Sequence, residues 1–330
     1  MNTMFFKALA LGGFTASFAL AESVSFIAIG DMGTGGDKQY KVANAIENLC
    51  QQKACDFAIG LGDNIYEAGV DSSRDDSFQS KFEQPYAGLA FPFFMSLGNH
   101  DNSHFASGGG LDNFKGEYQV AYHYRDDRSS DKWRMPNRYY HFTAPLGSEE
   151  PLIDFLALDS NPIAGGLDWD YQYWRKPYTK KHKEWINRTL STAEAPWKIA
   201  FAHHPLRSNG LHGNAGFYDG LAGSGKDWQN LIKETICDKV DVLITGHDHD
   251  LQWLKPSRDC GKTFFIVSGA GGKTRSLTNP DRNPAWWQVG DSLGFFRIQI
   301  ESNQFTGEAY VVDAESGQWE LVYSHAIMKP

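Results

Sequence analysis

The sequence has few cysteines, a deficit of basic residues, and no long apolar run beyond its N-terminal region. Only 4 of 330 residues are Cys, too few for a small domain held together mainly by disulfides. Lys and Arg total 31 against 40 Asp and Glu, giving a net charge of −9. This balance argues against a general nucleic-acid binder, which needs a basic face. The chain is 41% hydrophobic and 14% aromatic, which excludes a disordered protein and indicates an aromatic-rich globular one.

The first 21 residues have the composition of an export signal. Lys7 is the single charged side chain, an apolar run of 13 residues follows it, and Ala19-Leu20-Ala21 is a small-x-small cleavage site. The run is shorter than the roughly 20 residues needed to cross a bilayer, so we expect a signal peptide and not a membrane anchor. We therefore expect cleavage near Ala21 and export to the periplasm or the extracellular space. Residues 22–330 are expected to form a single domain, because no repeat, low-complexity tract or linker divides them.

Export would place the four cysteines in an oxidising compartment, where disulfides persist. Cys50, Cys55, Cys237 and Cys260 can pair in three ways. We favour pairing Cys50 with Cys55 and Cys237 with Cys260, since each pair would close a short helix-to-strand or hairpin segment. Neither pair has the CxxC spacing of a metal site, so we expect the cysteines to be structural or free.

Short apolar runs alternate with helical patterns along most of the chain. The predicted strands cover 23–30, 56–62, 91–98, 152–158, 197–202 and 240–246, and the predicted helices cover 37–52 and 179–193. Strands that are apolar throughout are buried on both faces, so the pattern predicts an α/β fold. Four more strands, without a convincing helix between them, are predicted at 251–255, 263–268, 293–300 and 304–312. We expect these to form a second, largely antiparallel sheet.

Five predicted strands end in motifs rich in carboxylate, imidazole, amide or phenol groups. The motifs are Asp31-Met32-Gly33, Gly62-Asp63-Asn64-Ile65-Tyr66, Gly98-Asn99-His100-Asp101, His203-His204-Pro205 and Gly246-His247-Asp248-His249. Ligands collect at the carboxyl ends of strands in open α/β sheets, so five such ends can converge on one pocket. These groups bind hard or borderline metals, and two metals about 3.5–4 Å apart are the usual device for phosphoryl transfer. One such motif alone is usually a turn, whereas the ordered set predicts a two-metal site.

These motifs follow one another in the order DxG, GDxxY, GNH(D/E), xxxH and GHxH. This order resembles the motif order of the metallophosphoesterase superfamily. Tyr66, three residues after Asp63, narrows the resemblance to the purple acid phosphatases, and most closely to their small, single-domain, tartrate-resistant type. The resemblance extends over most of the chain after residue 21. It implies a four-layer α/β-β/α sandwich of two mixed sheets flanked by helices. It also implies an exported acid phosphatase that hydrolyses phosphate monoesters with a metal-activated hydroxide.

The resemblance further assigns ligands to a dinuclear centre. The implied ligands of a ferric ion are Asp31, Asp63, Tyr66 and His249. The implied ligands of the second metal, which would be Fe(II), Zn or Mn, are Asn99, His203, His247 and the bridging Asp63. A phenolate such as that of Tyr66 is a hard anion and favours Fe(III), a Lewis acid strong enough to keep a bound hydroxide available well below neutral pH.

Two histidines are expected to act on the substrate. By resemblance, His100 would contact the phosphate and protonate the leaving group, whereas the spacing of His212 from His203 matches that of a second substrate histidine. The family's animal members have an acidic residue just before that histidine, where this chain has Leu211. Residues 160–178 fall where those members have a loop over the active site. They are expected to occlude the pocket, to form a wall against the substrate, or to pack as an ordinary surface loop.

Two alternatives to a secreted phosphomonoesterase stay open. GNHD and GHDH motifs are shared across the superfamily, so a phosphodiesterase or nucleotidase on the same fold is the nearest one. The other is a secreted binding protein that has lost catalysis, and the presence of all seven expected ligands argues against it. The expected partners are small phosphate esters, with no role as a nucleic-acid scaffold.

Overall fold

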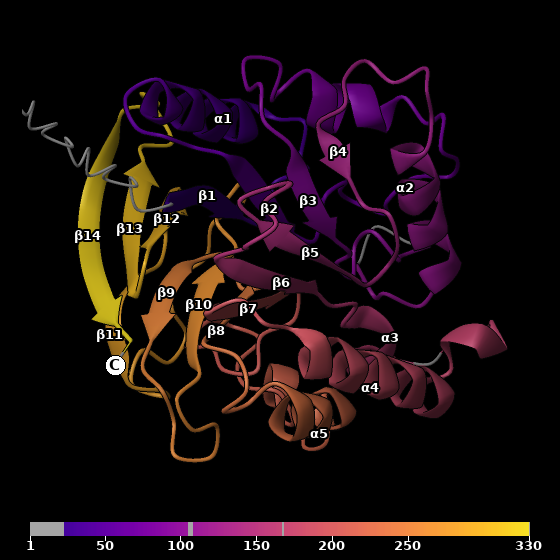
Figure 1. The fold of residues 1–330 in the computed structure, drawn as a ribbon. Helices are drawn as coiled ribbons and strands as arrows, with labels where there is room; N and C mark the ends of the chain where they lie inside the picture. Colours follow the sequence, from indigo (N-terminus) through magenta and orange to yellow (C-terminus); the bar gives the residue numbers. More distant parts are fainter. Residues whose placement is uncertain (1–22, 105–107, 167, 330) are drawn as a thin grey trace, which may run out of the picture.

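The computed structural model describes residues 23–104, 108–166 and 168–329 (Figure 1). The expected signal peptide, 1–21, lies outside these residues, and its cleavage near Ala21 stays a prediction. Within the described ranges, no helix combines the length and apolar character needed to cross a bilayer.

Two mixed sheets, each with seven of the described strands, pack against each other (Figure 1). The first has the order β14 (Trp319–Met328), β13 (Gln304–Val312), β12 (Leu293–Glu301), β1 (Ser23–Ile29), β2 (Phe57–Leu61), β3 (Phe93–Ser96), β4 (Trp133–Arg134). The second has the order β11 (Ala285–Val289), β9 (Leu251–Leu254), β10 (Phe264–Ser268), β8 (Val242–Thr245), β7 (Trp197–Ala202), β6 (Ile153–Ala157), β5 (Tyr140–Ala144). Strands β1 to β4 are parallel, as are β6, β7, β8 and β10, while the remaining pairings are antiparallel.

Helices cover the outer face of each sheet and complete the four layers (Figure 1). The α-helices are α1 (Asp37–Cys50) and α2 (Gly116–His123) beside the first sheet, and α3 (Asn161–Ala164), α4 (Arg175–Thr192) and α5 (Lys226–Thr235) beside the second. Single turns of 3-10 or π helix lie at Gln79–Glu83, Asn113–Lys115, Tyr171–Tyr173 and Tyr218–Gly220. This arrangement confirms the fold that the motif resemblance implied.

Aromatic side chains fill the space between the sheets. Phe26 on β1 stacks on Phe57 on β2 with ring centroids 5.3 Å apart, and Phe155 on β6 meets both rings edge-on. All three side chains are fully buried. Such pairs add to the free energy of area burial, so the two sheets are fixed face to face by their central strands.

The C-terminal strands do not form a separate antiparallel sheet, and that prediction was wrong. β9 and β10 join the second sheet, whereas β12 pairs with β1 and begins the antiparallel edge of the first. The sequence pattern identified the strands correctly but could not reveal their partners, which are up to 278 residues away, as for Ser23 and Glu301. Helix α4 begins at Arg175, four residues before the predicted start, because Pro177 is tolerated in the first turn of a helix.

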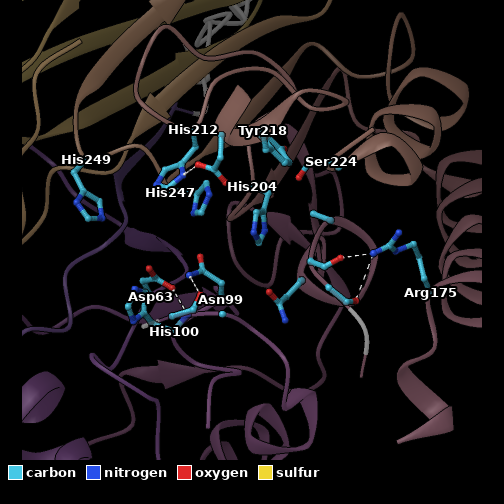
Figure 2. A pocket seen from close by; sticks show the side chains of 18 of the residues that line it. Asp63, Asn99, His100, Arg175, His204, His212, Tyr218, Ser224, His247 and His249 are labelled. Carbon is cyan, nitrogen blue, oxygen red and sulfur yellow. Dashed lines mark hydrogen bonds and ion pairs between the residues drawn. The ribbon is translucent and has the colours of Figure 1, made fainter. Parts of the chain in front are cut away.

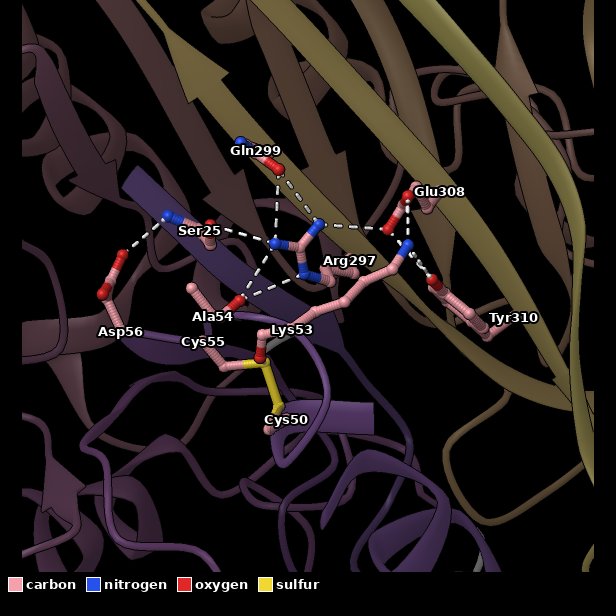
Figure 3. The surroundings of a disulfide bond; sticks show 10 residues. All are labelled: Ser25, Cys50, Lys53, Ala54, Cys55, Asp56, Arg297, Gln299, Glu308 and Tyr310. Atoms are coloured by element: carbon pink, nitrogen blue, oxygen red, sulfur yellow. Dashed lines mark hydrogen bonds and ion pairs between the residues drawn. A yellow bond between two sulfur atoms is a disulfide. The ribbon is translucent and has the colours of Figure 1, made fainter. Parts of the chain in front are cut away.

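Both disulfides have the local pairing that the sequence favoured. Cys50 is bonded to Cys55, and Cys237 to Cys260. Figure 3 shows the first disulfide beside the guanidinium of Arg297, which donates to the Ala54 carbonyl oxygen at 3.0 Å. The turn between α1 and β2 is thereby fixed to β12.

Candidate metal centre

The five motifs lie at the ends of β1, β2, β3, β7 and β8, at one edge of the packed sheets. β1, β2 and β3 are parallel neighbours in the first sheet, and β7 and β8 are parallel neighbours in the second. Parallel neighbours deliver their carboxyl ends to the same edge. The residues that follow these strands therefore converge, although they are spread over more than 200 residues of the chain.

Asp31, Tyr66 and His249 form one group of donor atoms. The Tyr66 hydroxyl lies 3.1 Å from Asp31 Oδ1 and 3.2 Å from His249 Nε2, and His249 Nε2 lies 3.4 Å from Asp31 Oδ1. All three side chains are buried. This set of carboxylate, phenol and imidazole donors suits a hard cation such as Fe(III).

Asn99, His203 and His247 form a second group beside Asp63. His203 Nε2 lies 2.8 Å from Asn99 Oδ1, 3.0 Å from His247 Nδ1 and 3.5 Å from Asp63 Oδ1. His203 Nδ1 lies 2.8 Å from the Leu61 carbonyl oxygen, to which it donates, so the Nε2 lone pair faces the other donors.

Asp63 lies between the two groups, and one ligand atom each of Asp31, Asp63 and His203 lie within 4.8 Å of one another. The structure thus brings together all seven residues that the motifs singled out as metal ligands.

Three of these residues adopt a backbone conformation that is uncommon for non-glycine residues. Asp31, Asp63 and His247 have φ values of 57°, 51° and 71°. Left-handed conformations of this kind concentrate at functional sites, where the surrounding structure must stabilise them. At Gly98, a Cβ atom would lie 2.2 Å from Asp63 Oδ1, so only glycine allows the neighbouring loop to approach that carboxylate.

The charges of the site are arranged to receive cations. Burial raises the pKa of Asp31 to about 8. Burial and the nearby carboxylates of Asp31 and Asp63 raise the pKa of the Tyr66 hydroxyl well above its usual value. Burial, assisted by the positive charge of Arg275, lowers the pKa of His249 to about 3, which keeps this ring neutral. Without a nearby positive charge these buried acidic groups hold their protons, and bound cations would supply the charge that ionises them, while the neutral imidazole of His249 has a lone pair to donate. The residues present therefore fit a metal centre.

Asp101, the last residue of the GNHD motif, connects the two loops on either side of Asp63. Its buried carboxylate accepts hydrogen bonds from the backbone N–H groups of Asn64 at 3.0 Å, Ile65 at 3.1 Å and Gly98 at 2.8 Å, and from Gln119 Nε2 at 2.8 Å. Sequence reasoning assigned no role to this residue, although its place in the motif was visible.

His100 lies beside the metal-ligand residues and lines the adjacent cavity. Its backbone N–H donates to Asp63 Oδ1 at 2.9 Å, and its ring lies 4.4 Å from that of Tyr66. Its Nδ1 lies 2.6 Å from the Glu67 carbonyl oxygen. Because Nδ1 donates to this carbonyl, Nε2 is the nitrogen left for a substrate.

His212 connects Asp219 with Arg275, and neither of these two partners was anticipated from the sequence. His212 Nδ1 lies 2.6 Å from Asp219 Oδ1, and its Nε2 lies 2.9 Å from Arg275 Nη1. A guanidinium only donates hydrogen bonds, so Nε2 accepts from Arg275 and Nδ1 carries the proton that is donated to Asp219. The acidic partner of His212 is thus Asp219, seven residues after it, whereas the residue directly before it, Leu211, is apolar. No local motif reveals this partner.

A cavity of about 480 Å³ extends from the metal-ligand residues along the second sheet's loops (Figure 2). In Figure 2, Asp63, Asn99, His100 and His249 lie toward one end, His212, His247 and His204 line the middle, and Arg175 lies at the other end. His204, the second residue of the His203-His204-Pro205 motif, is buried, and its Nδ1 lies 2.8 Å from Ser160 Oγ. Within residues 160–178, the residues that line the cavity are Asn161, Ala164, Gly165, Gly166 and Arg175.

Comparison with known proteins agrees with the motifs. Residues 24–251 match the calcineurin-like phosphoesterase family model. The chain is 27% identical to purple acid phosphatase 4 of Arabidopsis thaliana over 307 residues, which is 89% of this chain and 82% of the relative. It is 26% identical to tartrate-resistant acid phosphatase type 5 of Sus scrofa over 265 residues, covering 74% of this chain and 69% of the relative. The resemblance stated from the motifs is confirmed.

Solved structures share the fold. One is a Plasmodium protein described as "GAP50 the anchor in the inner membrane complex" (TM-score 0.72, 20% identity, 93% of this chain and 90% of that one). Another is the purple acid phosphatase PPD1 from yellow lupin (TM-score 0.60, 19% identity, 94% of this chain and 54% of that one). Because one of these structures is described as an anchor and the other as a phosphatase, the fold alone does not decide function, and the side chains of the site must.

Proposed function

Because this chain belongs to the calcineurin-like phosphoesterase family, whose purple acid phosphatases it resembles, we propose that it is an exported acid phosphatase. It hydrolyses phosphate monoesters at a dinuclear centre of Fe(III) and a divalent ion, Fe(II), Zn or Mn. The observation that carries the proposal is Tyr66, whose hydroxyl lies 3.1 Å from Asp31 Oδ1 and 3.2 Å from His249 Nε2. A phenol among these donors favours a trivalent ion, which a simple divalent phosphodiesterase does not need.

The proposed ligands of Fe(III) are Asp31, Asp63, Tyr66 and His249, and those of the divalent ion are Asp63, Asn99, His203 and His247. Such a pair of ions supplies Lewis acidity and lowers the pKa of bound water. The continuous core shared by both sheets supports a further proposal, that residues 22–330 form one catalytic domain.

The residues around the centre have separate proposed roles in binding and proton transfer. His100 presents Nε2 to the cavity, because Glu67 engages Nδ1, and it stabilises or protonates the leaving oxygen. Arg275 lines the cavity and binds the phosphate with the N–H groups that His212 does not engage. His212 is therefore a positioning residue in this proposal and not the second histidine acting on the substrate that the sequence suggested, since its Nε2 accepts a hydrogen bond from Arg275.

Chelation and reconstitution test this function. Removal of metal should abolish hydrolysis of a monoester such as para-nitrophenyl phosphate at acid pH, and iron with zinc or manganese should restore it. A preference for bis-para-nitrophenyl phosphate would favour the phosphodiesterase alternative. Full monoester activity in metal-free protein would contradict the proposal.

A further inference from the structure

The cavity is larger than a phosphate group requires, and its volume continues beyond the metal-ligand residues. Its volume of about 480 Å³ lies within the roughly 300–1,000 Å³ of pockets that enclose whole small-molecule ligands. Figure 2 shows Arg175 and Ser224 at the end away from His249. The leaving group of a bound ester would occupy this end of the cavity, so the residues that line this end determine which esters fit.

The far wall is polar and has little apolar surface. Its residues are Asn161, Ala164, Gly165, Gly166, Arg175, Gly223, Ser224 and Gly225. Gly225 directly precedes α5, so the positive end of that helix dipole also lies at this wall. The aromatic ring of Tyr218 also lines the cavity and lies against Gly225, but it is only 3% exposed and so offers little surface on which an aryl leaving group could stack. The wall therefore favours a leaving group that is itself polar.

Asn161 connects this wall with the loop that holds Gly110 and Asn113. The side chain is 1% exposed, and its Nδ2 donates to the Gly110 carbonyl oxygen at 2.9 Å and to Asn113 Oδ1 at 2.8 Å. Its Oδ1 is buried and accepts no hydrogen bond from any described residue. An oxygen without exposed surface is out of reach of a ligand, so Asn161 contributes to this wall by fixing it to Gly110 and Asn113 through its two donated hydrogen bonds.

Arg175 brings the positive charge of the far wall. It is the first residue of α4, and its Nη2 donates to the Gly165 carbonyl oxygen at the end of α3. Its Nη1 lies 3.7 Å from Asp227 Oδ2, and the two side chains are 37% and 45% exposed, so this ion pair contributes little. Nε is buried and makes no hydrogen bond to the described residues. The guanidinium is thus held in place by the carbonyls of Gly165 and Gly166, and the carboxylate beside it, that of Asp227, is a partly exposed partner at 3.7 Å that leaves most of its charge available.

We infer that the far wall is a subsite for a second anionic group, a carboxylate or a phosphate, carried by the phosphate ester. Arg175 pairs with this second anion. The inference rests on the proposed function and adds the substrate class. Phosphorylated sugar acids and sugar bisphosphates have this chemistry.

Two substrates that differ in the second anion provide the test. 3-Phosphoglycerate and glycerol 3-phosphate have the same carbon chain, and only the first has a carboxylate, while fructose 1,6-bisphosphate presents a second phosphate instead. In the wild type we expect a lower KM for the substrates with a second anion. Arg175→Gln should raise the KM for these about tenfold, as expected for loss of a hydrogen bond between charged groups. Arg175→Lys should restore part of the difference.

The control variant is Lys176→Gln, which removes the same charge from the adjacent, exposed residue that does not line this cavity. It should leave all three KM values unchanged, and inhibition by inorganic phosphate should be the same in Arg175→Gln as in the wild type. An Arg175→Gln effect that is equal for glycerol 3-phosphate and 3-phosphoglycerate would overturn the subsite while leaving the proposed function intact. Failure to hydrolyse any monoester would instead contradict the proposed function. The relative effects on 3-phosphoglycerate and fructose 1,6-bisphosphate identify which anion the subsite prefers.

Discussion

Asp219 should affect phosphate binding although it lies on the far side of His212 from Arg275. Asp219 holds the proton of His212 on Nδ1, which leaves Nε2 free to accept from Arg275. In Asp219→Ala this constraint is lost, and His212 can place its proton on Nε2, where it would face the donor N–H of Arg275. The guanidinium would then lose the partner that holds it at the cavity.

The size of the effect follows from exposure and hydrogen bonding. A hydrogen bond to a charged group contributes about 1.5–3 kcal/mol when it is well buried. The Asp219 side chain is 55% exposed and that of His212 is 20% exposed, so we discount this to about 1 kcal/mol. Phosphate binding should therefore weaken about fivefold in Asp219→Ala and roughly tenfold or more in Arg275→Gln.

A double-mutant cycle gives the decisive assay. The inhibition constant for inorganic phosphate is measured in both single variants, in the double variant, and in Glu234→Ala, which removes a carboxylate on α5 that is 54% exposed. The double variant should bind phosphate no more weakly than Arg275→Gln, a coupling of about 1 kcal/mol. Additive effects, within the about 0.3–0.5 kcal/mol expected of independent sites, would refute the connection through His212.

Further predictions concern catalysis, stability and pH. His100→Ala should keep both metals but lower kcat by about 10²–10⁴, the usual contribution of a general acid, and metal analysis beside steady-state kinetics checks this. Replacing Cys237 and Cys260 by Ser opens a loop whose ends are 23 residues apart, so denaturant titration should show a loss of roughly 3 kcal/mol in the free energy of unfolding. Although burial opposes it, hydrogen bonding to His141 lowers the pKa of Asp154, so this carboxylate stabilises the fold above its unfolded pKa of 3.8. Asp154→Asn should therefore cost about 1–2 kcal/mol at pH 7 and progressively less as the pH falls below 3.8, and an unchanged difference at pH 3 would contradict this assignment.

The local part of the fold and the donor residues could be predicted because they depend on short-range patterns. Apolar runs marked most central strands, and β7 and β13 have the predicted bounds. The motifs identified Asp63 and His249 because strand ends in α/β sheets converge. The sheet to which each C-terminal strand belongs could not be predicted. The place of β12 beside β1 depends on backbone pairing and on the packing of both of its faces, which are interactions between segments far apart in the sequence.

The groups missed in the site are those that act through tertiary contacts. Asp219 reaches His212 through a turn at Tyr218–Gly220 in which Asp219 itself has a φ of 56°. Arg275 lies in the loop between β10 and β11 and contacts His212 only in the folded chain. Composition and spacing carry no information about such contacts, whereas a carboxylate, an imidazole and a guanidinium in a row are evident in the structure.

The most direct test of the dinuclear ferric centre is the visible absorption and metal content of the purified protein, measured together with those of Tyr66→Phe. We predict one iron and one further metal per chain, and a visible tyrosinate-to-iron absorption in the wild type. That absorption should be absent in Tyr66→Phe, which lacks the phenol that lies 3.1 Å from Asp31. A colourless wild-type protein with two zinc or two manganese ions and full monoester activity would contradict this account.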